Sequence, residues 1–140
     1  MVSPRYFTVE EATAALPEVE RLLGKLRELR VDAVDATARL DALWERLPEG
    51  SHVLDELLAA QRELEHRTTS AEEVMEDLGG IGCLVRDLDL GLVDFPALAA
   101  GIEVFLCWRL GEDAIGYWHG TTEGYAGRKP LRLLPGGHFH

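Results

Sequence analysis

The sequence has little cysteine, with 2 residues of this type in 140. Cys83 and Cys107 form no CxxC pair, so neither a disulfide framework nor a zinc finger is indicated. Each lies between apolar neighbours in a segment that alternates like a β-strand. Because free cysteine is among the most buried residue types, we expect two buried free thiols.

Basic residues are also scarce, with 14 Lys and Arg against 25 Asp and Glu, and the net charge is −11. Nucleic acids and anionic membrane surfaces are held mainly by positive charge, which this chain lacks. The small basic group of Arg128, Lys129 and Arg132 does not reverse this. We therefore expect neither a nucleic-acid partner nor a membrane partner.

Long hydrophobic runs are missing as well. No apolar stretch approaches the roughly 18 residues of a membrane-spanning helix. Residues 1–11 have neither the charged region nor the apolar region of a signal peptide, so a cytoplasmic protein is expected. Hydrophobic residues make up 46% of the 140 residues, enough for residues 1–140 to form one domain with a buried core.

The first 80 residues have helical periodicity. Thr8-x-x-Glu11 is a capping box that predicts a short helix over residues 9–15, and Pro17 suits the first turn of a second helix or a kink. An uninterrupted 3-4 spacing of apolar residues then predicts a coiled-coil-like helix. Its positions are Val19, Leu22, Leu26, Leu29, Ala33, Ala36, Leu40, Leu43 and Leu47.

The turn at residues 48–51 leads into a second helix whose seam is weaker at its centre, where residues 68–70 predict a kink or a break. Gly79 and Gly80 are expected to end it. Two such helices make an antiparallel hairpin, with His52 and His66 on its surface. An arm of 30 residues would be about 45 Å long, which is more than a compact domain needs. We therefore expect either that part of the arm projects from the domain or that a second chain packs on it.

After Gly80 the periodicity becomes strand-like. Strands are expected over residues 83–90, 102–110 and 114–119, with Pro96 ending the run that begins at residue 91 and residues 97–101 as a connection. A three-residue turn at 111–113 would set the register of the last hairpin. That register pairs Trp108 with Gly116, Cys107 with Tyr117, and Phe105 with His119.

These patterns predict an α+β fold, in which a long antiparallel helical hairpin (residues 1–80, with the short N-terminal helix) packs on a small antiparallel β-meander (81–120). Residues 121–140 are expected to form an irregular tail. Both faces of the last hairpin carry large apolar residues. One face must meet the helices, and the other must meet the tail, a ligand or a second subunit.

Five segments, in order, carry a resemblance to a known family: FTVEEA with LPEV, GCLVRDLDLGLVDFPAL, VFLCWRLGE, YWH, and GYAGRKPL. The chain resembles the bacterial family called domain of unknown function 2203 over nearly its whole length. The family is uncharacterised, so the resemblance implies no activity. It implies that the helical seams are not part of the family's signature segments. It also implies that eight polar residues are part of them: Arg86, Asp87, Asp89, Asp94, Arg109, Glu112, His119 and Arg128.

A candidate site follows from six of these residues: Asp87, Asp89, Arg109, Glu112, His119 and Arg128. The guanidinium groups could bind an anionic ligand, the carboxylates and imidazole could hold a divalent metal, and the histidine could serve as a general base. A structural interpretation stands beside these. In it Asp87–Arg109 or Glu112–Arg128 are ion pairs, and Asp94 caps a turn.

Motifs of known catalytic chemistry are absent: there is no nucleophile elbow, P-loop, GxGxxG, HExxH or EF-hand loop. The leading hypothesis is a non-catalytic interaction module that self-associates as a homo-oligomer, because the helical seams are long and both faces of the last hairpin are apolar. Enzymatic activity is uncertain, and no cofactor is implied. The alternative is anionic-ligand binding or metal-dependent activity at the candidate site. His138 and His140 at the end of the sequence could bind a metal adventitiously.

Overall fold

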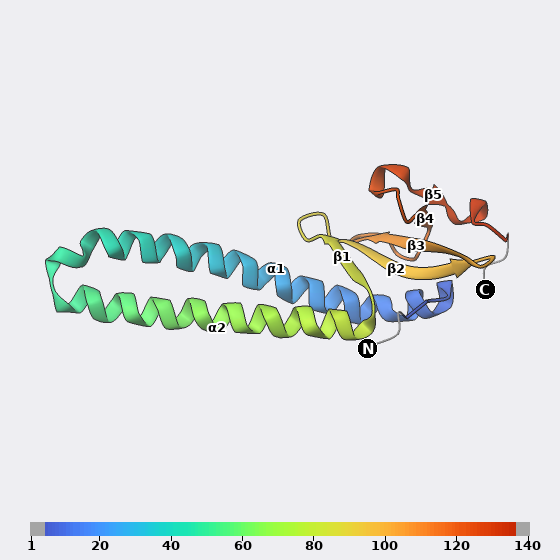
Figure 1. Ribbon diagram of the computed structural model, residues 1–140. Helices are drawn as coiled ribbons and strands as arrows, with labels where there is room; N and C mark the ends of the chain where they lie inside the picture. Colours follow the sequence, from blue (N-terminus) through green and yellow to red (C-terminus); the bar gives the residue numbers. More distant parts are fainter. Residues whose placement is uncertain (1–4, 137–140) are drawn as a thin grey trace. The chain divides into compact units, whose positions relative to one another are not determined.

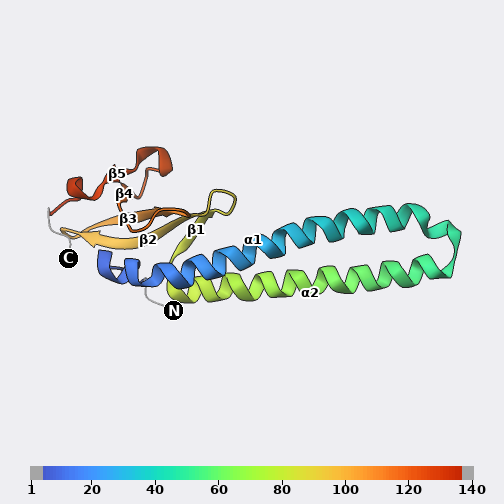
Figure 2. The same ribbon diagram turned by 180° about the vertical axis from the view of Figure 1, so that it is seen from behind.

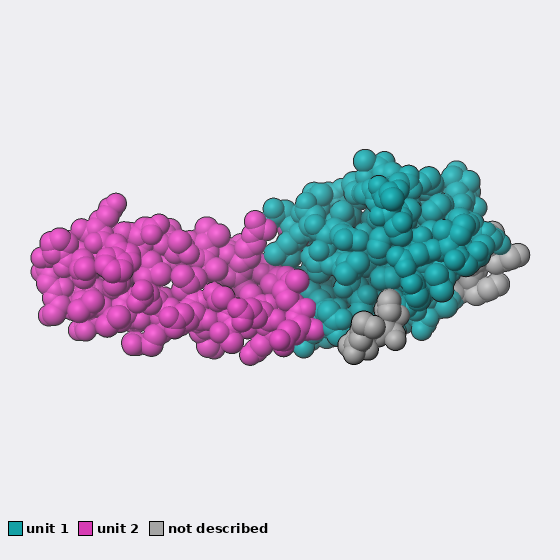
Figure 3. Space-filling view, in the orientation of Figure 1, with its two compact units in different colours: residues 1–23, 77–140 teal, residues 24–76 magenta. Residues whose placement is uncertain are grey.

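The computed structural model describes residues 5–136, so His138 and His140 lie outside the described residues. The chain forms two compact units, which Figure 3 colours separately. Unit 1 comprises residues 1–23 and 77–140, and unit 2, here called the arm, comprises residues 24–76. The α+β prediction is confirmed: two long helices and a five-stranded antiparallel sheet make up the fold (Figure 1).

Helix α1 runs without interruption over Val9–Arg46, so the prediction of a separate short helix ending near residue 15 was wrong. The capping box does start it: Thr8 N donates to Glu11 Oε1 at 2.9 Å, and Glu11 N donates to Thr8 Oγ1 at 3.0 Å. Pro17 lies inside the helix on its exposed side, and so does Thr13, four residues earlier. Because proline has no amide hydrogen, the carbonyl of Thr13 has no hydrogen-bond donor from the helix. Water can satisfy that carbonyl, and the buried stripe on the other side holds the helix together.

Helix α2 runs over Ser51–Ile81 after a 3₁₀ turn at Leu47–Glu49, and it passes through residues 68–70 without a break. Thr68 Oγ1 donates to the carbonyl of Leu64 at 3.0 Å, a bond that lets threonine stay inside a helix. The helix also continues past Gly79 and Gly80. It ends where Gly82 adopts a φ of +102° and donates its amide back to Leu78 O and Gly79 O.

The arm is a helical hairpin with its own small core near the connecting turn. Leu40, Leu43, Val53, Leu57 and Ala60 are buried together, with Leu64 packed beside them. Further along α1, the seam positions Ala33 and Ala36 are only half-buried. His52 and His66 are exposed, as expected.

The sheet has the strand order β1-β2-β3-β4-β5, with every neighbouring pair antiparallel. The strands are β1 Leu84–Asp87, β2 Leu92–Ala99, β3 Ile102–Arg109, β4 Tyr117–Gly120 and β5 Lys129–Pro130. The predicted pairs Phe105–His119 and Cys107–Tyr117 are confirmed. Strand β4 begins only at Tyr117, so Gly116 is not in the ladder opposite Trp108.

The second strand is longer than expected, because β2 continues through Pro96 to Ala99 and turns into β3 at Ala100 and Gly101. Strand β1 pairs only with Leu92–Asp94, so it does not extend alongside Pro96 on the side of β2 away from β3. The amide hydrogen that proline lacks is therefore not needed for a hydrogen bond between strands on that side. The carbonyl of Pro96 instead accepts the amide of Phe7 at 2.7 Å. This bond ties the start of the helical segment to the sheet within unit 1.

The two faces of the sheet differ. One face carries Val93, Phe95, Ala97, Val104, Leu106 and Trp108, all buried. Phe7 meets Phe95 edge-to-face with ring centroids 5.1 Å apart. In Figures 1 and 2 the first turns of α1, drawn in blue, lie against this sheet. The opposite face carries the polar residues described below.

The tail is more regular than predicted. It contains 3₁₀ turns at Tyr125–Gly127 and Leu131–Leu133, and it supplies β5 as the fifth strand. Trp118 Nε1 donates to Pro130 O at 3.2 Å, and Leu131 N donates to Gly116 O at 3.1 Å. These bonds fix residues 125–131 at one edge of the sheet. Among residues 5–136, no helix has the length and apolar character needed to cross a bilayer.

Candidate functional site

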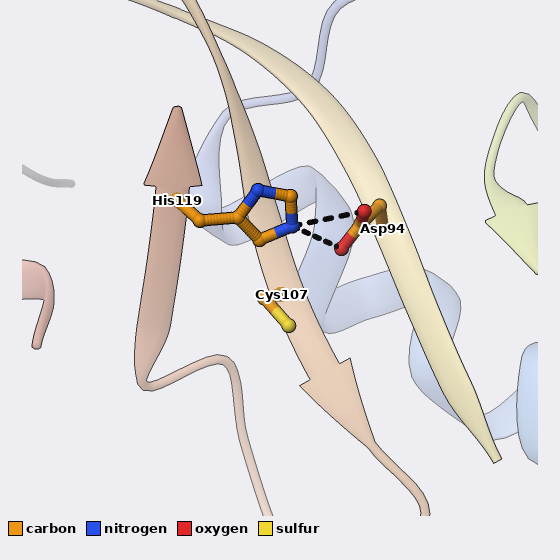
Figure 4. A group of neighbouring side chains, drawn as sticks. All are labelled: Asp94, Cys107 and His119. Atoms are coloured by element: carbon orange, nitrogen blue, oxygen red, sulfur yellow. Dashed lines mark hydrogen bonds and ion pairs between the residues drawn. The ribbon is translucent and has the colours of Figure 1, made fainter. Parts of the chain in front are cut away.

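Three buried polar side chains converge on the outer face of the sheet from neighbouring strands. Asp94 on β2 pairs with Cys107 on β3, and Phe105, two residues before Cys107, pairs with His119 on β4. Directly paired residues share a face, and so do residues two apart on a strand. Figure 4 shows the three side chains, which we call the strand cluster. His119 and Asp94 point toward each other, and Cys107 lies beside them on the strand between.

The closest contact in the strand cluster joins Asp94 and His119. His119 Nε2 lies 3.0 and 2.9 Å from the two Asp94 carboxylate oxygens, and Nδ1 lies 2.9 Å from the carbonyl oxygen of Gly120. Both ring nitrogens of His119 therefore face oxygen acceptors, a carboxylate on one side and a carbonyl on the other. The tautomer of the imidazole decides which of these contacts carries the proton.

Arg86 provides the second partner of Asp94. Its Nε donates to Asp94 Oδ2 at 2.9 Å, and its guanidinium carbon lies 4.9 Å from the centroid of the Phe105 ring. The side chain of Arg86 is 42% exposed while that of Asp94 is 2% exposed. The carboxylate thus faces an exposed cation on one side and the imidazole on the other, which compensates its buried charge.

Cys107 completes the strand cluster as a fully buried thiol. Burial raises the pKa of Cys107 to about 11, the Asp94 carboxylate adds to this, and the nearby Arg128 guanidinium partly offsets it. Burial likewise raises the pKa of Cys83, the other free cysteine, to about 11. Both thiols are protonated near neutral pH, and both nitrogens of His119 are already bonded. As arranged here, the three groups do not form an activated cysteine nucleophile.

A cavity of about 370 Å³ opens over the strand cluster, and we call it the sheet pocket. Asp94 and His119 lie in its wall, whereas Cys107 does not. Its lining is Arg86, Leu92, Asp94, His119, Thr121, Thr122, Glu123, Gly124 and Tyr125. Segment 121–125, which follows β4, therefore supplies more than half of the wall.

Tyr125 connects the sheet pocket to two arginines. Its hydroxyl accepts bonds from Arg109 Nη1 at 3.2 Å and from Arg128 Nη1 at 3.5 Å. The guanidinium carbon of Arg128 also lies over two tyrosine rings, 4.0 Å from the centroid of Tyr117 and 4.7 Å from that of Tyr125. The position of the Tyr125 hydroxyl is therefore set by two cations and by ring stacking.

Arg128 is held from the other side by Glu112 and the main chain. Its Nη2 donates to Glu112 Oε1 at 2.8 Å and to the carbonyl of Cys107 at 3.1 Å. Glu112 Oε1 also accepts the amide of Arg109 at 2.7 Å. The predicted Glu112–Arg128 ion pair is confirmed, and it lies next to the backbone of the strand cluster.

Glu123 brings a second carboxylate to the pocket wall. It accepts a bond from Lys129 Nζ at 2.6 Å and one from Gly120 N at 2.9 Å. The bond from Lys129, and then that from the Gly120 amide, lowers the pKa of Glu123 below its ordinary value. The charge of Glu123 is thus matched by Lys129.

The six residues predicted from the sequence divide into two groups. His119 lines the pocket, while Arg109, Glu112 and Arg128 support its wall through Tyr125. Asp87 Oδ1 instead accepts the amide of Leu90 at 3.0 Å in the turn after β1, so the predicted Asp87–Arg109 pair is not the contact observed. Asp89 is exposed beyond the end of that strand, and neither aspartate lines the pocket.

Sequence reasoning missed Asp94, Arg86, Cys107 and Tyr125 as members of the site. The interpretation of Asp94 as a turn cap was wrong, because β2 continues past it for five residues to Ala99. One signal in the sequence could have found three of the site residues. The predicted register of β3 with β4 was correct, and a matching antiparallel register of β2 with β3 places Asp94, Cys107 and His119 on one face. Residues 121–125 carry no comparable sequence signal.

Comparison with known proteins identifies the family. The model of the family described as "Uncharacterized conserved protein (DUF2203)" matches residues 5–131, and the chain belongs to this family. That range includes the strand cluster and the whole lining of the sheet pocket. No curated protein and no solved structure matches the chain.

Proposed function

We propose that this DUF2203 chain is a binding protein whose sheet pocket takes a small oxyanion, such as a molecule that carries a carboxylate or a phosphate group. The observation that carries the proposal is the set of hydrogen bonds made by the Tyr125 hydroxyl. It accepts two guanidinium bonds and lies in the pocket wall. Its own proton has no acceptor assigned among the described residues, so it is available to a ligand.

A hydroxyl that accepts from cations is a stronger donor than an isolated one, because each bond polarises the next. The ligand group that suits such a donor is a negatively charged oxygen. Arg86 adds a second donor at the same pocket, since its Nη groups have no bond assigned among the described residues and its side chain is 42% exposed. Thr121 and Thr122 contribute further hydroxyls.

The charges around the pocket permit an anion. Asp94 forms an ion pair with Arg86 and also contacts His119, and Glu123 forms an ion pair with Lys129. Arg109 and Arg128 stand behind Tyr125 with Glu112 as one counter-charge. The immediate surroundings therefore have no excess negative charge, in contrast to the −11 of the whole chain. A small ligand suits a cavity of about 370 Å³ better than a polymer does.

The test is a calorimetric titration of the full chain with inorganic phosphate, acetate, malonate and a phosphate monoester. Tyr125→Phe removes one hydroxyl and keeps the ring on which Arg128 lies. We expect at least one of these anions to bind, and binding to weaken about tenfold in the variant, which corresponds to about 1.4 kcal/mol. Tyr6→Phe is the control, because Tyr6 is a half-exposed tyrosine that donates to Glu103 elsewhere in unit 1. Equal affinity in Tyr125→Phe, or no binding of any anion, would contradict the proposal.

A second candidate function is self-association through the arm, as an interaction module of the coiled-coil type. Val31 and Val34 are 61% and 62% exposed, and their spacing of three places them on one side of α1. Leu54 and Leu58, four residues apart on α2, are each 42% exposed. Exposed apolar pairs of this kind favour a partner helix, and a second copy of the chain would supply one. A cytoplasmic location suits two reduced thiols.

Light scattering over a range of protein concentrations tests this candidate. We expect a mass above that of one 15.5 kDa chain, returning to the monomer mass in the Val31→Ser, Val34→Ser double variant. A monomer at all concentrations, or an oligomer that the double variant leaves intact, would refute association through the arm.

A further inference from the structure

We propose that the strand cluster is a binding site for a zinc-class divalent cation, with Asp94, Cys107 and His119 as its three protein ligands. Each residue offers one donor atom, and these atoms lie within 4.8 Å of one another. Donors around a tetrahedral zinc, at bond lengths of about 2.0–2.3 Å, are roughly 3.3–3.8 Å apart. The donor atoms of these three side chains, drawn in Figure 4, therefore need to approach one another by about 1 Å at most to close around the metal.

The donor set determines the class of metal. One sulfur, one imidazole nitrogen and one carboxylate oxygen suit zinc or cobalt, whereas magnesium and calcium prefer oxygen ligands alone. The three donors come from three adjacent strands of one antiparallel sheet, so their spacing is fixed by backbone hydrogen bonds. A rigid arrangement of ligands lowers the cost of ordering them when a metal binds.

The surrounding contacts are those of a metal site. His119 Nδ1 lies 2.9 Å from the carbonyl oxygen of Gly120, and Nε2 faces Asp94. With Nε2 on a metal, Nδ1–H would donate to that carbonyl. A metal-bound histidine is commonly oriented by such a bond. Arg86 holds one oxygen of Asp94, and Arg128 holds the carbonyl of Cys107, so the carboxylate and the backbone at the thiol are both fixed.

Charge balance also permits the exchange. Binding of M²⁺ forms metal–sulfur, metal–nitrogen and metal–oxygen bonds, and the proton of the Cys107 thiol passes to solvent together with any proton held on Nε2 of His119. The +2 charge of the metal is then met by the Cys107 thiolate and the Asp94 carboxylate.

The fourth coordination position would face the sheet pocket, because Asp94 and His119 lie in the pocket wall. Three protein ligands with one open position are the pattern of a zinc site that binds water or a substrate oxygen. The role of the open position rests on the proposed function, because an oxyanion in the sheet pocket would then contact the metal as well as the Tyr125 hydroxyl. The three-ligand site stands independently of it.

The test titrates Co²⁺ into the chelator-treated full chain and follows the thiolate-to-cobalt charge-transfer absorption, with Zn²⁺ as competitor. We expect one cobalt per chain, a charge-transfer band, and its loss on adding zinc. Cys107→Ala should abolish the band. Cys83→Ala is the matched control, because Cys83 is also a buried free thiol but lies outside the strand cluster, with its Sγ 3.6 Å from the carbonyl oxygen of Leu78. The band should survive in that variant.

Two further measurements separate the alternatives. His138→Asn with His140→Asn removes the terminal histidines, and the band must persist in that variant for the strand cluster to be the site. X-ray absorption at the zinc edge of the wild type should show one sulfur among nitrogen and oxygen neighbours, a result that does not depend on any variant folding. A wild type without the band, or a band that survives Cys107→Ala, would overturn the proposal.

The same variants distinguish the two proposals from each other. Tyr125→Phe should keep the cobalt band while losing affinity for the oxyanion. Oxyanion binding by the chelator-treated wild type without a cobalt band would leave the proposed function standing and remove the metal site. A cobalt band with no anion binding would do the reverse.

Discussion

Two of the clusters of polar and charged side chains in residues 5–136 differ strongly in their exposure to solvent. In unit 1, Asp94 and His119 are 1% and 3% exposed and their polar atoms are 2.9–3.0 Å apart. In the arm, Arg67 lies 3.5 Å from Glu63 and 3.9 Å from Asp32, and Arg39 lies 3.9 Å from Glu63. We call these four residues the arm cluster, whose side chains are 35–60% exposed.

This difference separates ion pairs that water screens from polar groups that depend wholly on each other. Exposed pairs gain little, because solvent competes for both charges. A buried carboxylate must be fully compensated, and removing its partner leaves a desolvated charge. A chain therefore tolerates change in the arm cluster much more readily than in the strand cluster. Burial marks the strand cluster as the place where residue identity matters.

The largest expected effect is that of Asp94→Asn. The substitution keeps the shape but removes the buried charge that pairs with Arg86 and contacts His119 Nε2, so unit 1 should lose about 3–5 kcal/mol of unfolding free energy. Urea denaturation followed by near-ultraviolet circular dichroism checks this, since Trp108 and Trp118 are buried in unit 1. Asp32→Asn in the arm is the matched control and should change little. A loss below about 1 kcal/mol for Asp94→Asn would mean that the strand cluster is as well solvated as the arm cluster.

A second, smaller effect is alkaline destabilisation of unit 1, which contains both cysteines. Burial raises the pKa of Cys83 from its ordinary 9.0 to about 11. The folded chain therefore keeps this proton where the unfolded chain releases it. The stability that the protonated thiol contributes is complete below pH 9 and is lost as the pH rises to about 11. Over two pH units this amounts to roughly 2–3 kcal/mol.

Cys83→Ala tests this pH dependence. Between pH 9 and 11 the unfolding free energy of the variant should fall less steeply than that of the wild type, with the remaining slope due in part to Cys107. Measurements at pH 7 give the separate cost of the smaller side chain. Parallel curves for wild type and variant would show that Cys83 titrates as an exposed thiol does.

How far the sequence predicts this molecule depends on the range of the interactions involved. The helices and the last hairpin follow from local patterns, namely the Thr8–Glu11 capping box, the apolar seams and the three-residue turn. The errors at Pro17 and Gly79 arose where buried packing outweighed a local helix-breaking tendency. Pro96 was misread because the consequence of proline in a strand depends on whether a neighbouring strand needs its amide.

The candidate site was predicted only in part for the same reason. His119, Glu112 and Arg128 lie in the segments that resemble the family, and the register of the last hairpin places His119 opposite Phe105. Asp94 joins His119 across an intervening strand, a relation that no spacing along the chain encodes. Tyr125 reaches the pocket through an irregular segment, whose path is set by bonds such as that from Trp118 Nε1 to Pro130 O. Sequence patterns specify elements well and contacts between non-neighbouring elements poorly.

The smallest expected effect is that of Arg67→Gln, which removes the residue shared by two pairs of the arm cluster. Because the side chain is 35% exposed and its contacts are 3.5–3.9 Å long, the cost should be at most about 0.5 kcal/mol and should shrink further at high salt. Thermal unfolding followed at 222 nm, which reports the helices, checks this at low and high ionic strength. A cost above about 1 kcal/mol that grows with protein concentration would mean that a second copy desolvates the arm cluster, because only association ties stability to concentration. The same cost at every concentration would mean that the arm shields its ion pairs by itself, and the contrast between the two clusters would then be one of degree.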